Sequence, residues 1–196
     1  KAEVVSRAIH FIDDVVQTGD LVSVFSVSDL SKKNLQPQFS RCKPKAEGNS
    51  LVENNRTVER KFKQNFQIPF RAVLDAQITG AHESPIAQAL IDLSLSNYLR
   101  GAKRANLVVF SDMIEHTQDF SIYRCQSIEL GLSEFRKSRA GAVQRPTFEN
   151  VAVYLSVVPR KKVSAQAIKC RDSFWVWFFG DNSGAAARLS RDDLPG

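Results

Sequence analysis

The side chains best suited to bind a cation or a partner come directly after a short apolar run. Residues 107–110 (LVVF) have the composition of a buried strand, and Ser111, Asp112, Glu115 and His116 follow them. In an open α/β sheet, ligands bind beyond the carboxyl ends of the strands. Hydroxyl and carboxylate oxygens are the ligands that Mg²⁺ and Mn²⁺ prefer. The pattern therefore predicts a polar site at this strand end.

Two other loops are expected at the same edge of the sheet. Asp29 follows the apolar run 21–27 (LVSVFSV), while Glu83 and Ser84 precede a predicted helix. Ser84 fits a helix N-cap, and Asp112 fits a turn cap. The residues expected to contact a partner are Asp29, Glu83, Ser111, Glu115 and His116.

Signatures of known enzyme classes are absent from the sequence. It contains no Gly-x-Ser-x-Gly elbow, no Gly-x-Gly-x-x-Gly loop and no Walker loop, which disfavours an α/β-hydrolase and nucleotide chemistry. One enzymatic alternative stays open, a metal-assisted hydrolase that uses Asp112, Glu115 and His116. In that alternative Glu115 and His116 would act as an acid and base pair.

Hydrophobic periodicity predicts helices that alternate with short strands. Phe62, Phe66 and Phe70 recur every four residues and predict a buried stripe, while Pro69 predicts that the helix kinks or restarts there. The alternation predicts an α/β fold, a three-layer αβα arrangement with a doubly wound, mostly parallel sheet. The expected helices are 1–16, 51–78, one starting at 84, 127–138 and 164–179. The expected strands are 21–27, 107–110 and 151–158, and a short extended piece is expected at 39–42.

Charge and hydropathy limit the classes of partner. The chain has 196 residues, a net charge of +6 and a pI of about 9.4, and 43% of its residues are hydrophobic. No apolar run reaches the roughly 18 residues that a membrane span needs, so we expect no membrane insertion. Basic residues favour an acidic protein surface or nucleic acid. The predicted basic surface comprises Lys32, Lys33, Arg41, Lys43, Lys45, Arg56, Arg60, Lys61 and Lys63, and a second cluster comprises Arg160, Lys161 and Lys162.

The cysteines give a weaker indication of the compartment. Cys42, Cys125 and Cys170 are far apart and form no Cys-x-x-Cys pair, a pattern that predicts neither a disulfide framework nor a zinc site. This favours a reducing, cytoplasmic compartment, with an extracytoplasmic domain of an anchored protein as the alternative.

Two segments resemble the von Willebrand factor type A (VWA) family. Residues 108–112 (VVFSD) are similar to the VWA strand that ends in Ser/Thr-Asp-Gly, and residues 83–90 (ESPIAQAL) resemble the family's Gly-Thr-x-h-x-x-Ala-Leu helix start, where h is apolar. The matching order of elements covers residues 1–179. The resemblance implies a metal-ion-dependent adhesion site for Mg²⁺ or Mn²⁺, with Ser84 in place of the family's Thr and Asp112 in place of its later Asp.

The sequence departs from the family in two respects. The family's Asp-x-Ser-x-Ser loop precedes the first helix, and this chain starts inside that helix, so the loop would lie upstream. Met113 stands where the family has Gly. We therefore expect a bacterial, non-enzymatic, protein-binding VWA-like module over residues 1–180 and a disordered tail over 181–196. Its partner would carry an acidic surface or a carboxylate, and a nucleic-acid-associated factor is the first alternative.

Overall fold

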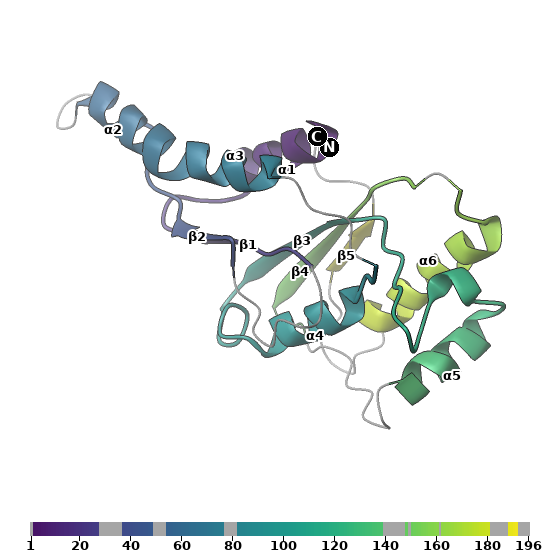
Figure 1. Ribbon diagram of the computed structural model, residues 1–196. Helices are drawn as coiled ribbons and strands as arrows, with labels where there is room; N and C mark the ends of the chain where they lie inside the picture. Colours follow the sequence, from purple (N-terminus) through teal and green to yellow (C-terminus); the bar gives the residue numbers. More distant parts are fainter. Residues whose placement is uncertain are drawn as a thin grey trace. The chain divides into compact units, whose positions relative to one another are not determined.

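The computed structural model describes residues 2–27, 37–48, 54–76, 82–138, 148, 150–160, 162–180 and 188–191. The chain divides into two compact units (Figure 1). The N-terminal unit comprises residues 1–26, 36–80 and 195–196, and the C-terminal unit comprises residues 27–35 and 81–194. Asp29, Lys32 and Lys33 lie outside the described residues.

The N-terminal unit contains most of the elements predicted for the first part of the chain. Strand β1 pairs antiparallel with β2, with Leu21 opposite Cys42. Helix α1 places Val5, Ala8, Phe11 and Ile12 in the core. The elements are α1 (Ala2–Asp14), β1 (Leu21–Val24), β2 (Phe39–Cys42), α2 (Asn55–Phe62), the π-helical turn η1 (Lys63–Gln67) and α3 (Ile68–Asp75).

An aromatic stack forms the core of the long helical stretch. Phe66 and Phe70 are 1% and 5% exposed, and their ring centroids lie 6.1 Å apart in a stacked arrangement. Phe39 from β2 approaches both rings edge-on, at 5.5 and 5.6 Å. Edge-to-face and offset stacking are the favoured geometries of aromatic pairs. The prediction that this stripe is core is confirmed for Phe66 and Phe70, whereas Phe62 is half-buried and stacks on Phe66.

Pro69 interrupts this stretch by a restart of the helix, one of the two outcomes predicted for it, since α3 begins at Ile68. The turn before it widens into the π-helical η1, and Pro69 occupies the first turn of α3. In a regular α-helix the carbonyl of Asn65 would accept a hydrogen bond from residue 69, but proline has no N–H to donate. The guanidinium of Arg41 donates to that carbonyl instead, so one basic residue satisfies an acceptor that the helix leaves open.

Lys43 is a structural residue and not part of an exposed basic surface. It is 8% exposed, and its Nζ donates to the carbonyls of Ile12 and Val16 at 2.6 and 2.7 Å. The last carbonyls of a helix lack partners within the helix, and a positive charge near its C-terminus is favourable. Lys43 therefore caps α1, which corrects its assignment to the basic surface.

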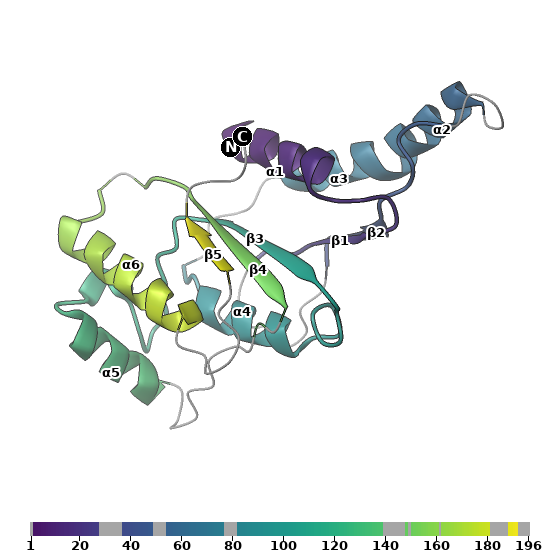
Figure 2. The same ribbon diagram turned by 180° about the vertical axis from the view of Figure 1, so that it is seen from behind.

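The C-terminal unit combines a parallel sheet with helices, which is compatible with the α/β class. Its strands run in the order β3-β4-β5, and Ser111 at the end of β3 pairs with Val157 at the end of β4. Helices α5 and α6 pack together, and α4 lies beside the sheet (Figures 1 and 2). The elements are α4 (Ile86–Leu95), β3 (Ala105–Ser111), η2 (Ile122–Arg124), α5 (Ile128–Ser138), β4 (Val151–Val157), α6 (Ala165–Gly180) and β5 (Arg188–Arg191).

Strand β5 was not anticipated from the sequence. Residues 188–191 pair in parallel with β4, with Leu189 opposite Val153, where the composition of 181–196 predicted a disordered tail. Pairing with a buried strand supplies the backbone hydrogen bonds that a short, polar segment cannot obtain alone. The rest of that predicted tail lies outside the described residues.

The aromatic end of α6 is core. Phe174, Trp175, Phe178 and Phe179 are each at most 3% exposed, and Ser164 begins the helix by accepting a hydrogen bond from the Ala167 N–H at 3.1 Å. Of this segment only Val176 is largely exposed, at 55%.

Among the described residues, no helix is long and apolar enough to cross a membrane.

A disulfide joins Cys125 to Cys170 across 45 residues of sequence. It connects the segment after η2 to α6. Gly131 of α5 leaves room for it, because a Cβ there would lie 3.0 Å from the Cys125 sulfur. The scattered spacing of the cysteines predicted no disulfide, so this interpretation was wrong. Cys42 is exposed and free.

Candidate functional site

A tight turn follows β3 and positions the predicted polar residues. The Ser111 hydroxyl accepts a hydrogen bond from the Met113 N–H, and the Asp112 carboxylate accepts one from the Ile114 N–H, both at 3.0 Å. Met113 has a φ of +57°, in the left-handed region that favours glycine. It is 1% exposed, and its carbonyl accepts a hydrogen bond from Trp175 Nε1 at 2.7 Å. Burial and these contacts hold the strained turn.

The carboxylate of Asp112 pairs with Arg160, which follows β4. Arg160 Nη1 donates to Asp112 Oδ2 at 2.9 Å. Because β3 and β4 are parallel and in register, their carboxyl ends meet at one edge of the sheet, and the Val158 N–H donates to the Ser111 carbonyl at 2.8 Å. The hydrogen bond to Asp112, followed by the charge interaction with Tyr123, raises the pKa of Arg160 above its usual value.

Tyr123 completes an exposed cluster with these two residues. The Arg160 guanidinium carbon lies 5.7 Å from the centre of the Tyr123 ring, a cation–π distance. The side chains of Arg160 and Asp112 are 55% and 21% exposed, and Tyr123 is 40% exposed. We call Asp112, Tyr123 and Arg160 the edge cluster. It presents an arginine and a tyrosine to solvent in a fixed arrangement.

His116 contacts the edge cluster through Tyr123. Its Nδ1 lies 2.8 Å from the hydroxyl of the fully buried Ser121, and its ring meets Tyr123 edge-on at 5.5 Å. The His116 backbone also exchanges two hydrogen bonds with Ser84, at 2.6 and 3.1 Å. The structure thus brings the loop before α4 beside the loop after β3. It shows no hydrogen bond between the Ser84 side chain and the Asp112 carboxylate, both of which it describes.

Glu115 caps helix α4, a role that the sequence suggested for Ser84. Its Oε2 accepts a hydrogen bond from the Ala87 N–H at 2.8 Å, and α4 has no cap from the side chain that immediately precedes it. A carboxylate at a helix N-terminus is stabilised by the free N–H groups and by the helix dipole. Glu115 is only 3% exposed, so it is not available to a partner, and the predicted partner contact is corrected.

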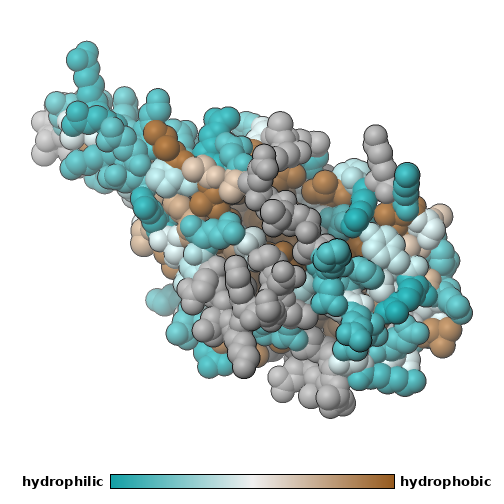
Figure 3. All heavy atoms as spheres, in the orientation of Figure 1, coloured by the Kyte–Doolittle hydropathy of each residue, from teal (hydrophilic) through white to brown (hydrophobic). Residues whose placement is uncertain are grey.

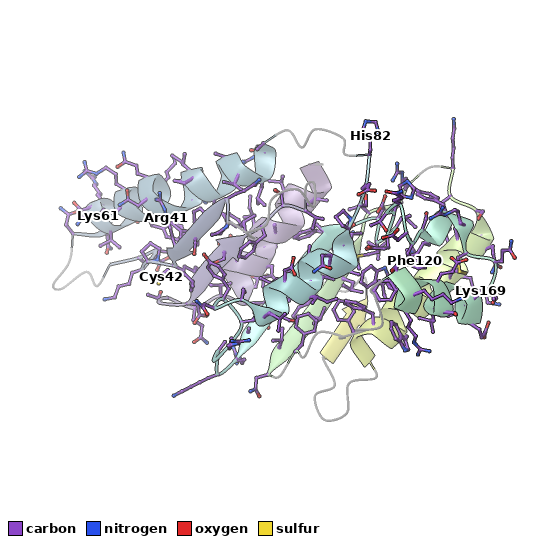
Figure 4. The ribbon with its side chains drawn as sticks, turned by 60° about the horizontal axis from the view of Figure 1, so that its bottom comes forward. Arg41, Cys42, Lys61, His82, Phe120 and Lys169 are labelled. Carbon is purple, nitrogen blue, oxygen red and sulfur yellow. A yellow bond between two sulfur atoms is a disulfide. The ribbon has the colours of Figure 1, made fainter. Side chains whose placement is uncertain are left out.

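Glu83 ties the same two loops together. Its Oε1 accepts a hydrogen bond from the Gln118 N–H at 3.0 Å, and the Gln118 carbonyl accepts one from Arg124 Nη2 at 3.0 Å. The neighbouring His82 is exposed and points away from the elements around it (Figure 4). Glu83 therefore supports the loop that carries Tyr123.

Among the described residues, no cluster of further metal ligands surrounds the two candidate ligands, Ser84 and Asp112. Within the described part of the chain, His, Cys, Asp and Glu form no group of three or more that could hold a metal ion. The Asp112 carboxylate already accepts hydrogen bonds from Ile114 and Arg160. An Mg²⁺ or Mn²⁺ ion at Asp112 would consequently compete with the Arg160 guanidinium.

A surface hollow of about 430 Å³ lies next to the loop that precedes Tyr123. Its volume falls within the range of ligand pockets, but such pockets depend mainly on apolar and aromatic walls. The described residues that line this hollow are polar or charged, of both signs, namely Asp119, Arg124, Glu134, Lys137 and Ser138. Among these described residues there is no aromatic or aliphatic side chain to anchor a small molecule.

The basic surface of the N-terminal unit is concentrated on α2 and η1. Arg56, Arg60 and Lys63 recur at intervals of four and three residues, so they share one helix face, and all three are exposed. Lys61, Arg41 and Lys45 are exposed in the same unit; Figure 4 labels Lys61 and Arg41, and Figure 3 shows the hydrophilic surface over α2. Glu59 is the one acidic residue of α2.

Sequence reasoning missed Arg160 and Tyr123 as site residues. Arg160 was visible only as the start of a basic triplet that ends a strand. The available signal was topological, because a residue that follows β4 must reach the same sheet edge as one that follows β3.

Comparisons with family models, with curated proteins and with solved structures found no match for this chain.

Proposed function

We propose that this protein is a non-enzymatic, protein-binding VWA-like module whose partner contacts the carboxyl edge of β3 and β4. The observation that carries the proposal is the edge cluster of Asp112, Tyr123 and Arg160. Arginine and tyrosine are enriched among the residues that dominate binding energy at interfaces. The carboxyl ends of parallel strands are also where open α/β sheets bind their ligands.

Two further observations favour this function over a metal-assisted hydrolase. Glu115, one of the three residues that the hydrolase would use, is buried and caps α4. Asp112 is paired with Arg160, which occupies the carboxylate oxygen that a metal would need. A hydrolase of this kind would have to break both contacts before it could bind a metal ion or move a proton.

The finer fold assignment belongs to the same proposal. We infer a three-layer, doubly wound arrangement, supported by the parallel order β3-β4-β5 with α5 and α6 as the connections between consecutive strands. Helical connections between parallel strands are the units from which doubly wound sheets are built. The left-handed backbone of Met113 also supports the VWA-like reading, because glycine, the residue expected there, adopts that conformation readily.

Site-specific photo-crosslinking tests the proposal. A photoreactive phenylalanine analogue at Tyr123, which is 40% exposed, should yield discrete protein adducts in the cells that make this protein. The same analogue at Leu130 of α5, which is 55% exposed, is the matched control and should yield none of these adducts. Absence of protein adducts from position 123 would contradict the proposal.

A second candidate function, nucleic-acid binding, is favoured by the basic face of α2 and η1. Arg56, Arg60 and Lys63 could neutralise about three phosphates, so the logarithm of affinity should fall with the logarithm of salt concentration at a slope of about −2 to −3. Fluorescence anisotropy with a labelled oligonucleotide measures this slope. Replacing all three residues by alanine should abolish binding, and a wild-type protein that does not bind at low salt would exclude this candidate.

A further inference from the structure

We infer that Arg160 binds a carboxylate of the partner protein directly, so that the edge cluster recognises an acidic side chain without a metal ion. This inference rests on the proposed function and names the chemistry of its partner. In a metal-dependent site, the cation would join a protein carboxylate to a partner carboxylate. Here the guanidinium of Arg160 is already bound to Asp112. It can therefore join the Asp112 carboxylate to a partner carboxylate, as the cation would.

The guanidinium has hydrogen-bonding capacity beyond its bond to Asp112. It carries five N–H donors in a planar fork that matches a carboxylate, and Nη1 supplies the bond to Asp112. The side chain remains 55% exposed. A second carboxylate can therefore approach from solvent while the first one stays in place.

The arginine is also held in position before a partner arrives. Asp112 is fixed by the turn after β3, since its other carboxylate oxygen accepts from the Ile114 N–H. Tyr123 supports one face of the guanidinium, and His116 packs edge-on against Tyr123. Ordering a long side chain beforehand removes part of the entropy cost of binding, so Arg160 is better prepared to act as an anchor than a solvated surface arginine.

A protein carboxylate fits this site better than a nucleic-acid backbone. Arg160 is paired with Asp112, and the loop that carries Tyr123 also contains Asp119, which is exposed. These carboxylates would repel a continuous chain of phosphates, whereas one acidic side chain needs a single guanidinium. Nucleic-acid binding requires several phosphate contacts, and the described residues arrange repeated basic side chains on α2 and η1 instead.

A nuclear magnetic resonance titration of the full chain with tetraglutamate in the presence of EDTA tests the inference. We expect saturable amide shifts at residues 111–113, Tyr123 and Arg160, and no such shifts with tetraglutamine. Arg160→Ala should weaken tetraglutamate binding about tenfold or more, since one charge-assisted hydrogen bond is lost. Arg160→Lys should bind with intermediate affinity, because lysine keeps the charge but lacks the fork.

Arg136→Ala is the matched control. Arg136 of α5 is exposed and lies 5.5 Å from the ring centre of Trp177, so it is also an arginine over an aromatic ring. It lies on a helix and not at the strand edge. Its replacement should leave tetraglutamate affinity unchanged. Dispersed spectra of both arginine variants would show that any loss of binding is not caused by unfolding.

Three results would overturn the inference. They are wild-type affinity in Arg160→Ala, binding that appears only when Mg²⁺ or Mn²⁺ is added, and amide shifts that fall on residues 56–63. Failure of the proposed function can be distinguished from failure of this inference. Protein adducts at position 123 that persist unchanged in Arg160→Ala would retain the protein-binding function and reject Arg160 as the anchor, whereas absence of adducts would reject the function itself.

Discussion

Cys170→Ser should lower the free energy of unfolding by about 4 kcal/mol relative to the oxidised wild type. The Cys125–Cys170 disulfide links residues that are 45 apart in sequence, and a loop of this length restricts the unfolded chain by about that amount. Urea denaturation of the wild type and the variant, followed by tryptophan fluorescence, measures the difference. The fluorescence reports on this unit because Trp175 and Trp177 lie on α6.

Two controls make the disulfide prediction specific. Cys42→Ser should leave stability unchanged, since Cys42 is exposed and free. A reducing agent should shift the wild type to the stability of Cys170→Ser and have no effect on that variant. Titration of three free thiols in the unreduced wild-type protein would contradict the prediction. Disulfides persist in oxidising compartments, so a stable bond would also reverse the cytoplasmic expectation drawn from cysteine spacing.

The second large loss of stability is expected from substitutions of Glu115. Glu115→Ala removes a buried carboxylate that accepts from the Ala87 N–H, and should lower the free energy of unfolding by about 2 to 3 kcal/mol, the cost of losing a buried, charge-assisted hydrogen bond. Glu115→Gln keeps an acceptor oxygen of the same shape but loses the charge at the helix N-terminus. Its cost should therefore be smaller, about 1 kcal/mol.

Denaturation experiments on three variants test this role. Glu134→Ala on α5 is the control, because Glu134 is an exposed glutamate on a helix, and it should change stability by less than about 0.5 kcal/mol. Far-ultraviolet circular dichroism should show a loss of helix in Glu115→Ala at intermediate urea concentrations. Equal stability of Glu115→Ala and the control would mean that the carboxylate does not support α4.

Local sequence pattern was enough to locate most secondary structure. The apolar stripe of residues 51–78 predicted the helix that extends over α2, η1 and α3, and the runs 107–110 and 151–158 predicted β3 and β4. The last helix was predicted to begin at residue 164, and the Ser164 hydroxyl accepts a hydrogen bond from the Ala167 N–H at its start. These features depend on neighbours within about four residues, which the sequence displays directly.

Helix caps that come from residues distant in the sequence could not be predicted from local pattern. Ser84 has the composition and position of an N-cap, but Glu115, 28 residues after Ala87, supplies the oxygen that accepts the Ala87 N–H. Lys43 looked like one basic residue among many, yet it caps a helix that ends near Val16. The backbone groups at a helix end accept any partner that the fold brings near, so composition could not distinguish a local cap from a remote one.

The sequence by itself determined the order of the helices and of strands β1, β3 and β4, the burial of Phe66 and Phe70, and the presence of polar residues after β3. Only the tertiary structure decided which of these polar residues are exposed and which are buried, and that Arg160 meets Asp112 and Tyr123. The disulfide between Cys125 and Cys170 was decided in the same way. The physical reason is that periodicity reflects repeats of two to four residues, whereas the edge cluster depends on the parallel register of β3 and β4, whose paired residues are 46 positions apart, from Ser111 to Val157.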